Sequence, residues 1–164
     1  MIFARTALSS TLIAITFLLS MMVATAFAQD KGVKTILFIC EHGSAKSIVA
    51  AAYFNRIAGD KQLDIMAISR GTHPDAVVPD KINKLLNGDG FPNHSEKPTQ
   101  LTKEDLKAAD YVVSFTTIPT SYGNNEKIEL WNAPSFESGY PASRDSIVHN
   151  IERIIERIKS QNQK

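Results

Sequence analysis

An apolar run that passes almost directly into a helix is the feature that most restricts the fold of this chain. Residues 34–40 (KTILFIC) are nearly all apolar, which is typical of a strand buried on both faces of a parallel sheet. After a short loop, the alanine-rich residues 47–58 (SIVAAAYFNRIA) predict a helix that ends near Gly59. A buried strand followed at once by a helix indicates an α/β fold.

The same alternation continues along the chain. Helix start and stop signals predict a helix at residues 79–87. A capping box with Asp105 in place of the usual Glu or Gln predicts a short helix from Thr102 through Ala109. Apolar runs predict three further strands, at residues 63–69, 111–116 and 127–131.

A last helix is predicted after a cap formed by Ser143, Arg144 and Asp145. Its apolar residues are spaced by one, three and four positions, which marks one helix face: Ile147, Val148, Ile151, Ile154, Ile155 and Ile158. The order is therefore strand, helix, strand, helix, helix, strand, strand, helix. This order predicts an α/β domain with an open parallel sheet flanked by helices.

Cys40 is the only cysteine among the 164 residues, so no internal disulfide can form. It lies at the predicted carboxyl end of the first strand, and open parallel sheets bind their ligands beyond such ends. A loop between a strand and a helix N-terminus can turn several N–H groups toward one anion, where the helix dipole adds partial positive charge. A thiolate would be stabilised there as another anion would be.

Besides Cys40, two further residues of this segment, Lys46 and Ser47, can take part in this chemistry. Lys46 supplies a full positive charge, and Ser47 can donate a hydrogen bond to the thiolate. The pattern indicates attack of the Cys40 thiolate on phosphorus, giving a cysteinyl-phosphate that water then hydrolyses, with no metal or organic cofactor. The alternative is a cysteine that only packs in the core, as free cysteines often do.

The first 28 residues predict a secretory signal peptide. Arg5 precedes a long apolar stretch that ends in the small-residue pattern Ala26-Phe27-Ala28. Cleavage after Ala28 would leave one domain, residues 29–164, in an exported, periplasmic location without stable membrane association. A retained membrane anchor is the alternative, because the apolar stretch is long enough to span a bilayer.

Charge and histidine spacing exclude several kinds of partner. Residues 1–28 contain one of the 18 Lys and Arg residues and none of the 17 Asp and Glu residues, so the remainder has no net charge with neutral histidines. No basic field therefore points to nucleic acid or to an anionic membrane surface. The four histidines lack the spacing of metal ligands, so no metal site is expected.

The loop from Cys40 to Ser47, a cysteine, five residues, a basic residue and a serine, resembles that of low-molecular-weight protein tyrosine phosphatases and thioredoxin-linked arsenate reductases. Residues 69–73 (SRGTH), 98–115 and the segment from Trp131 onward resemble further parts of that family. The resemblance implies a four-stranded parallel sheet, Cys40 as the nucleophile and Ser47 as its support. It also implies a phosphate-binding loop of Glu41, His42, Gly43, Ser44, Ala45 and Lys46.

Two positions depart from the family pattern. Lys46 stands where the family has an arginine, whose planar fork grips two phosphate oxygens while a lysine is a point charge. Ala133-Pro134 stands where the family has an aspartate before a proline, so the general acid is missing. Glu137 is the candidate substitute acid.

Within the loop, Gly43 replaces an asparagine that tends to be left-handed, a conformation that glycine adopts readily. Glu41 opposes anion binding through its charge. His42 could offset that charge or donate a proton, although we expect its side chain to point outward, because neighbouring side chains in such a loop need not face the ligand.

The sequence thus predicts hydrolysis of aryl phosphate monoesters, phosphotyrosine among them, with weakened activity. Two alternatives remain open. One is a degenerate protein that binds an oxyanion or a phosphorylated ligand without turnover. The other is an arsenate reductase that depends on an external thiol, because the chain has no second cysteine for an internal relay. The expected ligands are phosphate, arsenate or a phosphorylated molecule.

Overall fold

The computed structural model describes residues 33–92, 96–123 and 126–162. The signal peptide predicted for residues 1–28 lies outside these ranges. The elements follow the predicted order, with one additional 3-10 turn, η1: β1 (Lys34–Cys40), α2 (Lys46–Asp60), β2 (Ile65–Gly71), α3 (Asp80–Gly88), α4 (Lys103–Ala108), β3 (Tyr111–Ser114), η1 (Thr120–Tyr122), β4 (Ile128–Leu130) and α5 (Tyr140–Asn162).

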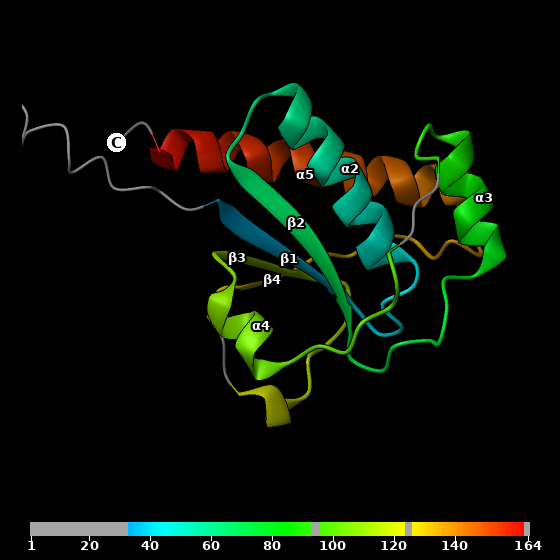
Figure 1. The fold of residues 1–164 in the computed structure, drawn as a ribbon, viewed down its shortest axis with the longest axis horizontal. Coiled ribbons are helices and arrows are strands. Elements are labelled where there is room, and N and C mark those ends of the chain that lie inside the picture. The colour runs from blue at the N-terminus through cyan, green and yellow to red at the C-terminus, as the bar shows by residue number, and fades with distance from the viewer. Residues whose placement is uncertain (1–32, 93–95, 124–125, 163–164) are drawn as a thin grey trace, which may run out of the picture. The chain divides into compact units, whose positions relative to one another are not determined.

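The strands form one four-stranded parallel sheet in the order β2-β1-β3-β4 (Figure 1). Cys40 is paired with Gly71 at the last register position of β1 and β2, and Ile39 is paired with Ser114 of β3. The carboxyl ends of these three strands therefore meet at one edge of the sheet, and Cys40 lies at that edge. The predicted α/β fold with an open parallel sheet is confirmed.

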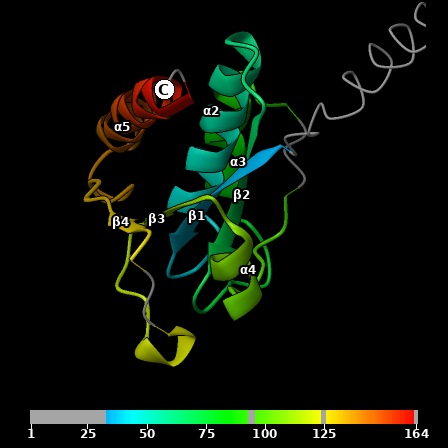
Figure 2. The ribbon, with the colours of Figure 1, turned by 90° about the vertical axis from the view of Figure 1, so that its left-hand side faces the viewer.

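Helices cover both faces of the sheet (Figures 1 and 2). The side chains of β1 alternate between these faces: Ile36 and Phe38 join the core under α2, α3 and α5, whereas Leu37 and Ile39 join the smaller core under α4. All four side chains are fully buried. A strand covered on both faces has no polar side, and this explains the unbroken apolar run in the sequence.

The start of the last helix corrects one prediction. α5 begins at Tyr140, so Ser143, Arg144 and Asp145 lie inside the helix and do not cap it. The Ser143 hydroxyl instead donates to the carbonyl oxygen of Pro134 at 2.8 Å, and it ties the helix to the segment before it. By contrast, the capping box of α4 is confirmed, with Thr102 and Asp105 bonded reciprocally. In the described ranges, no helix combines the length and apolarity of a membrane span.

Candidate functional site

The loop between β1 and α2 surrounds the Cys40 sulfur. The Ser47 Oγ atom lies 3.1 Å from Cys40 Sγ, and the Gly43 N–H donates to the same sulfur at 3.2 Å. Both groups can donate to a thiolate, so both would stabilise its negative charge. Ser47 is fully buried, and only 7% of Cys40 is exposed. The structure thus brings together the predicted nucleophile and the serine predicted to support it.

A second loop, after β2, holds the first one from outside. The N–H groups of Thr72, His73 and Asp75 donate to the carbonyl oxygens of Cys40, Glu41 and His42 at 3.1, 2.8 and 3.0 Å. These bonds turn the carbonyls of the Cys40 loop away from its centre. An oxyanion at the centre would therefore meet N–H groups rather than carbonyl oxygens.

The N-terminus of α2 is open toward this centre. Within the described residues, no hydrogen bond satisfies the N–H groups of Ser44, Ala45 or Lys46, and the N-cap residue Ala45 has no side chain that could do so. Unpaired N–H groups at the positive end of a helix dipole form an anion site. The loop therefore suits a phosphoryl group.

Two glycines allow the two loops to approach. Gly43 has a φ of +60°, the left-handed conformation that glycine adopts without strain. A Cβ atom on Gly43 would lie 2.8 Å from the Gly71 nitrogen, and one on Gly71 would lie 2.7 Å from the Gly43 nitrogen. Sequence reasoning identified Gly43 but missed Gly71, because its requirement arises only from the close approach of the second loop.

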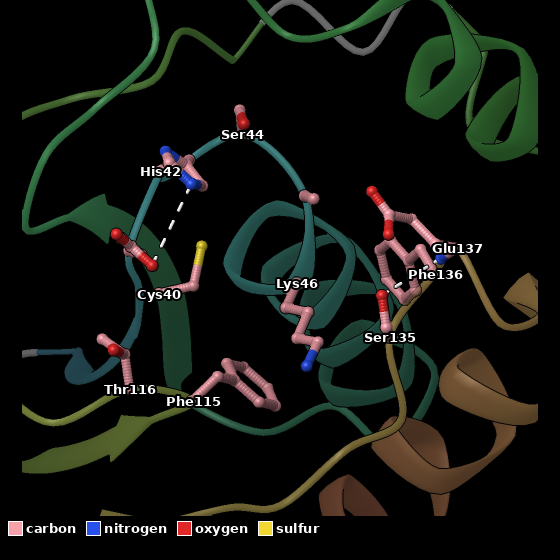
Figure 3. Close-up of a pocket in the computed structure, with 11 residues that line it drawn as sticks. Cys40, His42, Ser44, Lys46, Phe115, Thr116, Ser135, Phe136 and Glu137 are labelled. Atoms are coloured by element: carbon pink, nitrogen blue, oxygen red, sulfur yellow. Dashed lines mark hydrogen bonds and ion pairs between the residues drawn. The ribbon is translucent and has the colours of Figure 1, made fainter.

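A pocket of about 400 Å³ opens over the Cys40 loop (Figure 3). Its other walls come from the end of β3 and from the segment that precedes α5. The side chains that line it are Cys40, Glu41, His42, Ser44, Ala45, Lys46, Phe115, Thr116, Ser135, Phe136 and Glu137. Every predicted loop residue except Gly43 therefore lines one pocket with Cys40, and Ser47 supports the sulfur from behind.

Lys46 does not place its ammonium group over the loop. Its Nζ donates to the carbonyl oxygen of Ala133 at 2.7 Å, and in Figure 3 the side chain runs between Phe115 and Ser135. Ala133 is buried and carries no proton donor. Lys46 and Ala133, the two positions at which the sequence resemblance predicts a departure from the family pattern, thus meet in one contact.

His42 lies in the pocket lining, and its side chain is 59% exposed, so the expectation that it points outward stays a prediction. Its Nδ1 is 3.5 Å from Asp75 Oδ1, and its Nε2 is 4.0 Å from Glu41 Oε2. Asp75 also accepts a 2.5 Å hydrogen bond from Ser44 Oγ. Sequence reasoning missed Asp75, since 31 residues separate it from Ser44 and no motif connects them.

Glu137 lies on the opposite wall and is exposed. Its backbone N–H donates to Ser135 Oγ at 3.2 Å, and none of the described residues forms a hydrogen bond or ion pair with its carboxylate. The structure therefore places the candidate substitute acid at the pocket without fixing its orientation.

The wall before α5 is anchored by a partly buried carboxylate, that of Asp89. Asp89 Oδ2 accepts hydrogen bonds from Tyr140 at 2.5 Å and from Tyr53 at 2.7 Å, while Arg144 pairs with Oδ1 at 3.2 Å. Burial opposes ionisation of Asp89, but these hydrogen bonds and the Arg144 charge outweigh it and lower the pKa of Asp89. The Tyr140 ring packs edge-on against the pocket residue Phe136, so the network supports the pocket wall.

Among the described residues, no cluster of His, Cys, Asp or Glu could hold a metal ion. The site can therefore be described by its thiol, its N–H groups and the charged side chains named above.

The sequence of residues 35–122 matches the family model of the low molecular weight phosphotyrosine protein phosphatases. This range spans more than half of the chain and includes the Cys40 loop and the loop after β2. A comparison with curated protein sequences finds no match.

Solved structures share the fold at low sequence identity. The chain superposes on YfkJ from Bacillus subtilis with a TM-score of 0.71 and 17% identity, over 80% of this chain and 98% of that one. A low molecular weight protein tyrosine phosphatase from T. tengcongensis superposes with a TM-score of 0.64 and 19% identity, over 76% of this chain and 99% of that one. The thioredoxin-dependent arsenate reductase Cg_ArsC1' from Corynebacterium glutamicum superposes with a TM-score of 0.64 and 21% identity, over 92% of this chain and 75% of that one.

Proposed function

Because this chain belongs to the low molecular weight phosphotyrosine protein phosphatase family, we propose that it hydrolyses aryl phosphate monoesters, phosphotyrosine among them. One observation carries the proposal: the Cys40 sulfur faces a pocket while it contacts Ser47 Oγ at 3.1 Å and the Gly43 N–H at 3.2 Å. A cysteine that served only as a core residue would need neither a pocket nor two donors.

The reaction follows from this geometry. The Cys40 thiolate attacks phosphorus, so an S–P bond forms as the P–O bond to the leaving group breaks. The phosphoryl oxygens lie against the N–H groups of Ser44, Ala45 and Lys46 at the positive end of the α2 dipole. Water then attacks phosphorus, phosphate is released and the thiolate is restored.

The contact between Lys46 and Ala133 supports weakened activity. To reach a phosphoryl oxygen, the Lys46 ammonium must leave or share the Ala133 carbonyl oxygen that it binds at 2.7 Å. Even then it offers one point charge in place of the two parallel bonds of an arginine fork. Loss of one charge-assisted contact costs about 1–3 kcal/mol, which lowers the rate by roughly 5- to 150-fold.

Hydrolysis of p-nitrophenyl phosphate by the purified protein, with reductant present, tests the proposal. This substrate has a good leaving group, so it needs little help from a general acid. We expect turnover that is lost in Cys40→Ser, while Cys40→Ser still binds phosphate in a calorimetric titration. Equal turnover by the wild-type protein and Cys40→Ser would contradict the role of Cys40.

Binding of an oxyanion or a phosphorylated ligand without turnover is the second candidate function. It is favoured by the Lys46 ammonium, which is held on the Ala133 carbonyl, and by the absence of an acid at Ala133. In that case the wild-type protein and Cys40→Ser would bind phosphate equally well, and neither would hydrolyse p-nitrophenyl phosphate.

Arsenate reduction with an external thiol is a third candidate, supported by the fold shared with an arsenate reductase. Arsenate resembles phosphate in shape and charge, so the same loop would bind it. An assay of arsenate reduction with added glutathione separates this activity from hydrolysis.

An exported, periplasmic location belongs to the same proposal and is supported by Arg5, the apolar stretch and the Ala26-Phe27-Ala28 pattern. N-terminal sequencing of the protein recovered from cell fractions tests it. We expect Gln29 as the first residue in the exported fraction.

A further inference from the structure

His42 lines the pocket and Asp75 lies beside it, and the proposed function uses neither side chain. We infer that His42, positioned by Asp75, is the general acid that protonates the leaving oxygen. The inference rests on the proposed phosphatase activity and adds a proton donor to it.

The first support is that Asp75 is hydrogen-bonded to the Cys40 loop. Its Oδ2 accepts a hydrogen bond from Ser44 Oγ at 2.5 Å, and its backbone N–H donates to the His42 carbonyl oxygen at 3.0 Å. Its Oδ1 lies 3.5 Å from His42 Nδ1. Asp75 is thus bound to the Cys40 loop through both its backbone and its side chain, so its carboxylate can fix the orientation of the imidazole ring.

The second support is the direction of the ring. Since Nδ1 faces Asp75, the opposite nitrogen, Nε2, is left on the side of Glu41, and Figure 3 shows His42 above the pocket that holds Cys40. Glu41 and His42 both line the pocket with Cys40, so the side of the ring that carries Nε2 borders the pocket.

The third support is chemical need. Ala133 offers no proton, so a leaving oxygen would otherwise depart as an anion. The charged or titratable groups around the histidine are Glu41 and Asp75, and the same pocket is lined by Cys40, Lys46 and Glu137. Histidine is the side chain that enzymes use most often for proton transfer.

One proton passes from His42 to the leaving oxygen, and another returns to His42 from water. The thiolate of Cys40 forms the S–P bond, the P–O bond breaks, and its electron pair stays on the leaving oxygen, which takes the Nε2 proton of the protonated His42. The ring then keeps its Nδ1 proton toward Asp75. In the second step, Nε2 takes a proton from the water that attacks phosphorus, and the S–P electron pair returns to sulfur.

The test compares two substrates that differ in their need for an acid, p-nitrophenyl phosphate and phenyl phosphate, in the full chain. For His42→Asn we expect kcat/KM to fall about 100-fold on phenyl phosphate and less than about threefold on p-nitrophenyl phosphate. The alkaline fall of the phenyl phosphate pH profile should disappear in the same variant. If His42 had only a structural role, its substitution would lower kcat/KM by the same factor for both substrates.

Two further variants sharpen the test. His73→Asn is the matched control, because His73 is exposed, lies outside the pocket lining and bonds Glu41 only through its backbone N–H. It should behave as the wild-type protein on both substrates. Asp75→Asn removes the carboxylate charge that positions the ring, so it should reduce phenyl phosphate turnover by about tenfold and shift the alkaline limb of its pH profile to lower pH.

The outcomes separate this inference from the proposed function. Cys40-dependent turnover with the same substrate ratio in His42→Asn and the wild-type protein would overturn the inference and leave the phosphatase intact. If the ratio of kcat/KM on the two substrates changed in Glu137→Gln and not in His42→Asn, Glu137 would be the acid, and the inference would also be overturned. No turnover of p-nitrophenyl phosphate would overturn both.

Discussion

The two walls of the pocket differ in what their function depends on. Three hydrogen bonds from the loop after β2 to carbonyl oxygens hold the loop wall, residues 40–47, in a shape whose backbone N–H groups suit an anion. The late wall, residues 131–139, would serve the family reaction through one acidic side chain, and the sequence resemblance predicts that Ala133 stands at that position. Anion binding built from backbone tolerates changes of side chain, whereas proton transfer is lost with a single residue unless another group replaces it.

Gly43→Ala should break the loop wall and have the largest effect. The new Cβ would lie 2.8 Å from the Gly71 nitrogen at a φ of +60°, so strain and overlap should lower the free energy of unfolding by about 3 kcal/mol. Urea unfolding and phosphate titration measure the two consequences, lost stability and lost binding.

Gly59→Ala is the matched control for that change. Gly59 lies in α2 and no atom comes within 4 Å of the position its Cβ would take, so alanine should stabilise the helix by up to about 1 kcal/mol. Similar losses of stability in both variants would show that the contact between Gly43 and Gly71 is unimportant.

Asp89→Asn should loosen the support of the late wall. It removes a charge that two tyrosine hydroxyls and Arg144 satisfy, and since Asp89 remains partly exposed, we expect a loss of about 1–2 kcal/mol near neutral pH. Urea unfolding at fixed pH gives this value.

The pH dependence of this loss follows from the lowered pKa of Asp89. Stability from a carboxyl group with a lowered pKa is fully present above the pKa of the unfolded chain and is lost as pH falls through the lower, folded value. The difference between the wild-type protein and Asp89→Asn should therefore shrink below about pH 4. A constant difference down to about pH 2 would contradict the assigned ionisation.

Lys46→Arg should strengthen the link between the walls and the phosphoryl group. The planar fork can hold a phosphoryl oxygen pair, so kcat/KM for p-nitrophenyl phosphate should rise about tenfold, which equals about 1.4 kcal/mol. A decrease would show that the bond from Lys46 to the Ala133 carbonyl matters more than its charge near the loop.

Ser143→Ala should have the smallest effect. It removes the hydrogen bond from the Ser143 hydroxyl to the Pro134 carbonyl, worth about 1 kcal/mol, and leaves the loop wall untouched. Thermal unfolding should show the loss while phosphate affinity stays unchanged. A loss of phosphate binding would show that the two walls are coupled.

The sequence predicted the loop wall well because its signals are local. The apolar run at residues 34–40 and the alanine-rich helix place Cys40 at the end of a strand, and the spacing together with the family resemblance indicates Lys46 and Ser47. The predicted cap at Ser143 lies three residues inside α5, because the Ser143 hydroxyl donates to the Pro134 carbonyl oxygen and does not cap the helix. Competition for one hydroxyl cannot be read from the local sequence.

By itself, the sequence determined the parallel α/β sheet and the position of Cys40 at its carboxyl edge, whereas the missing acid at Ala133 is predicted only by the family resemblance. The tertiary structure alone decided that Lys46 binds a carbonyl 87 residues away and that Asp75 contacts His42. The physical reason is the separation along the sequence over which each effect acts. Periodicity and turns act over a few residues, whereas a flexible side chain adopts the orientation in which folded neighbours satisfy its hydrogen bonds.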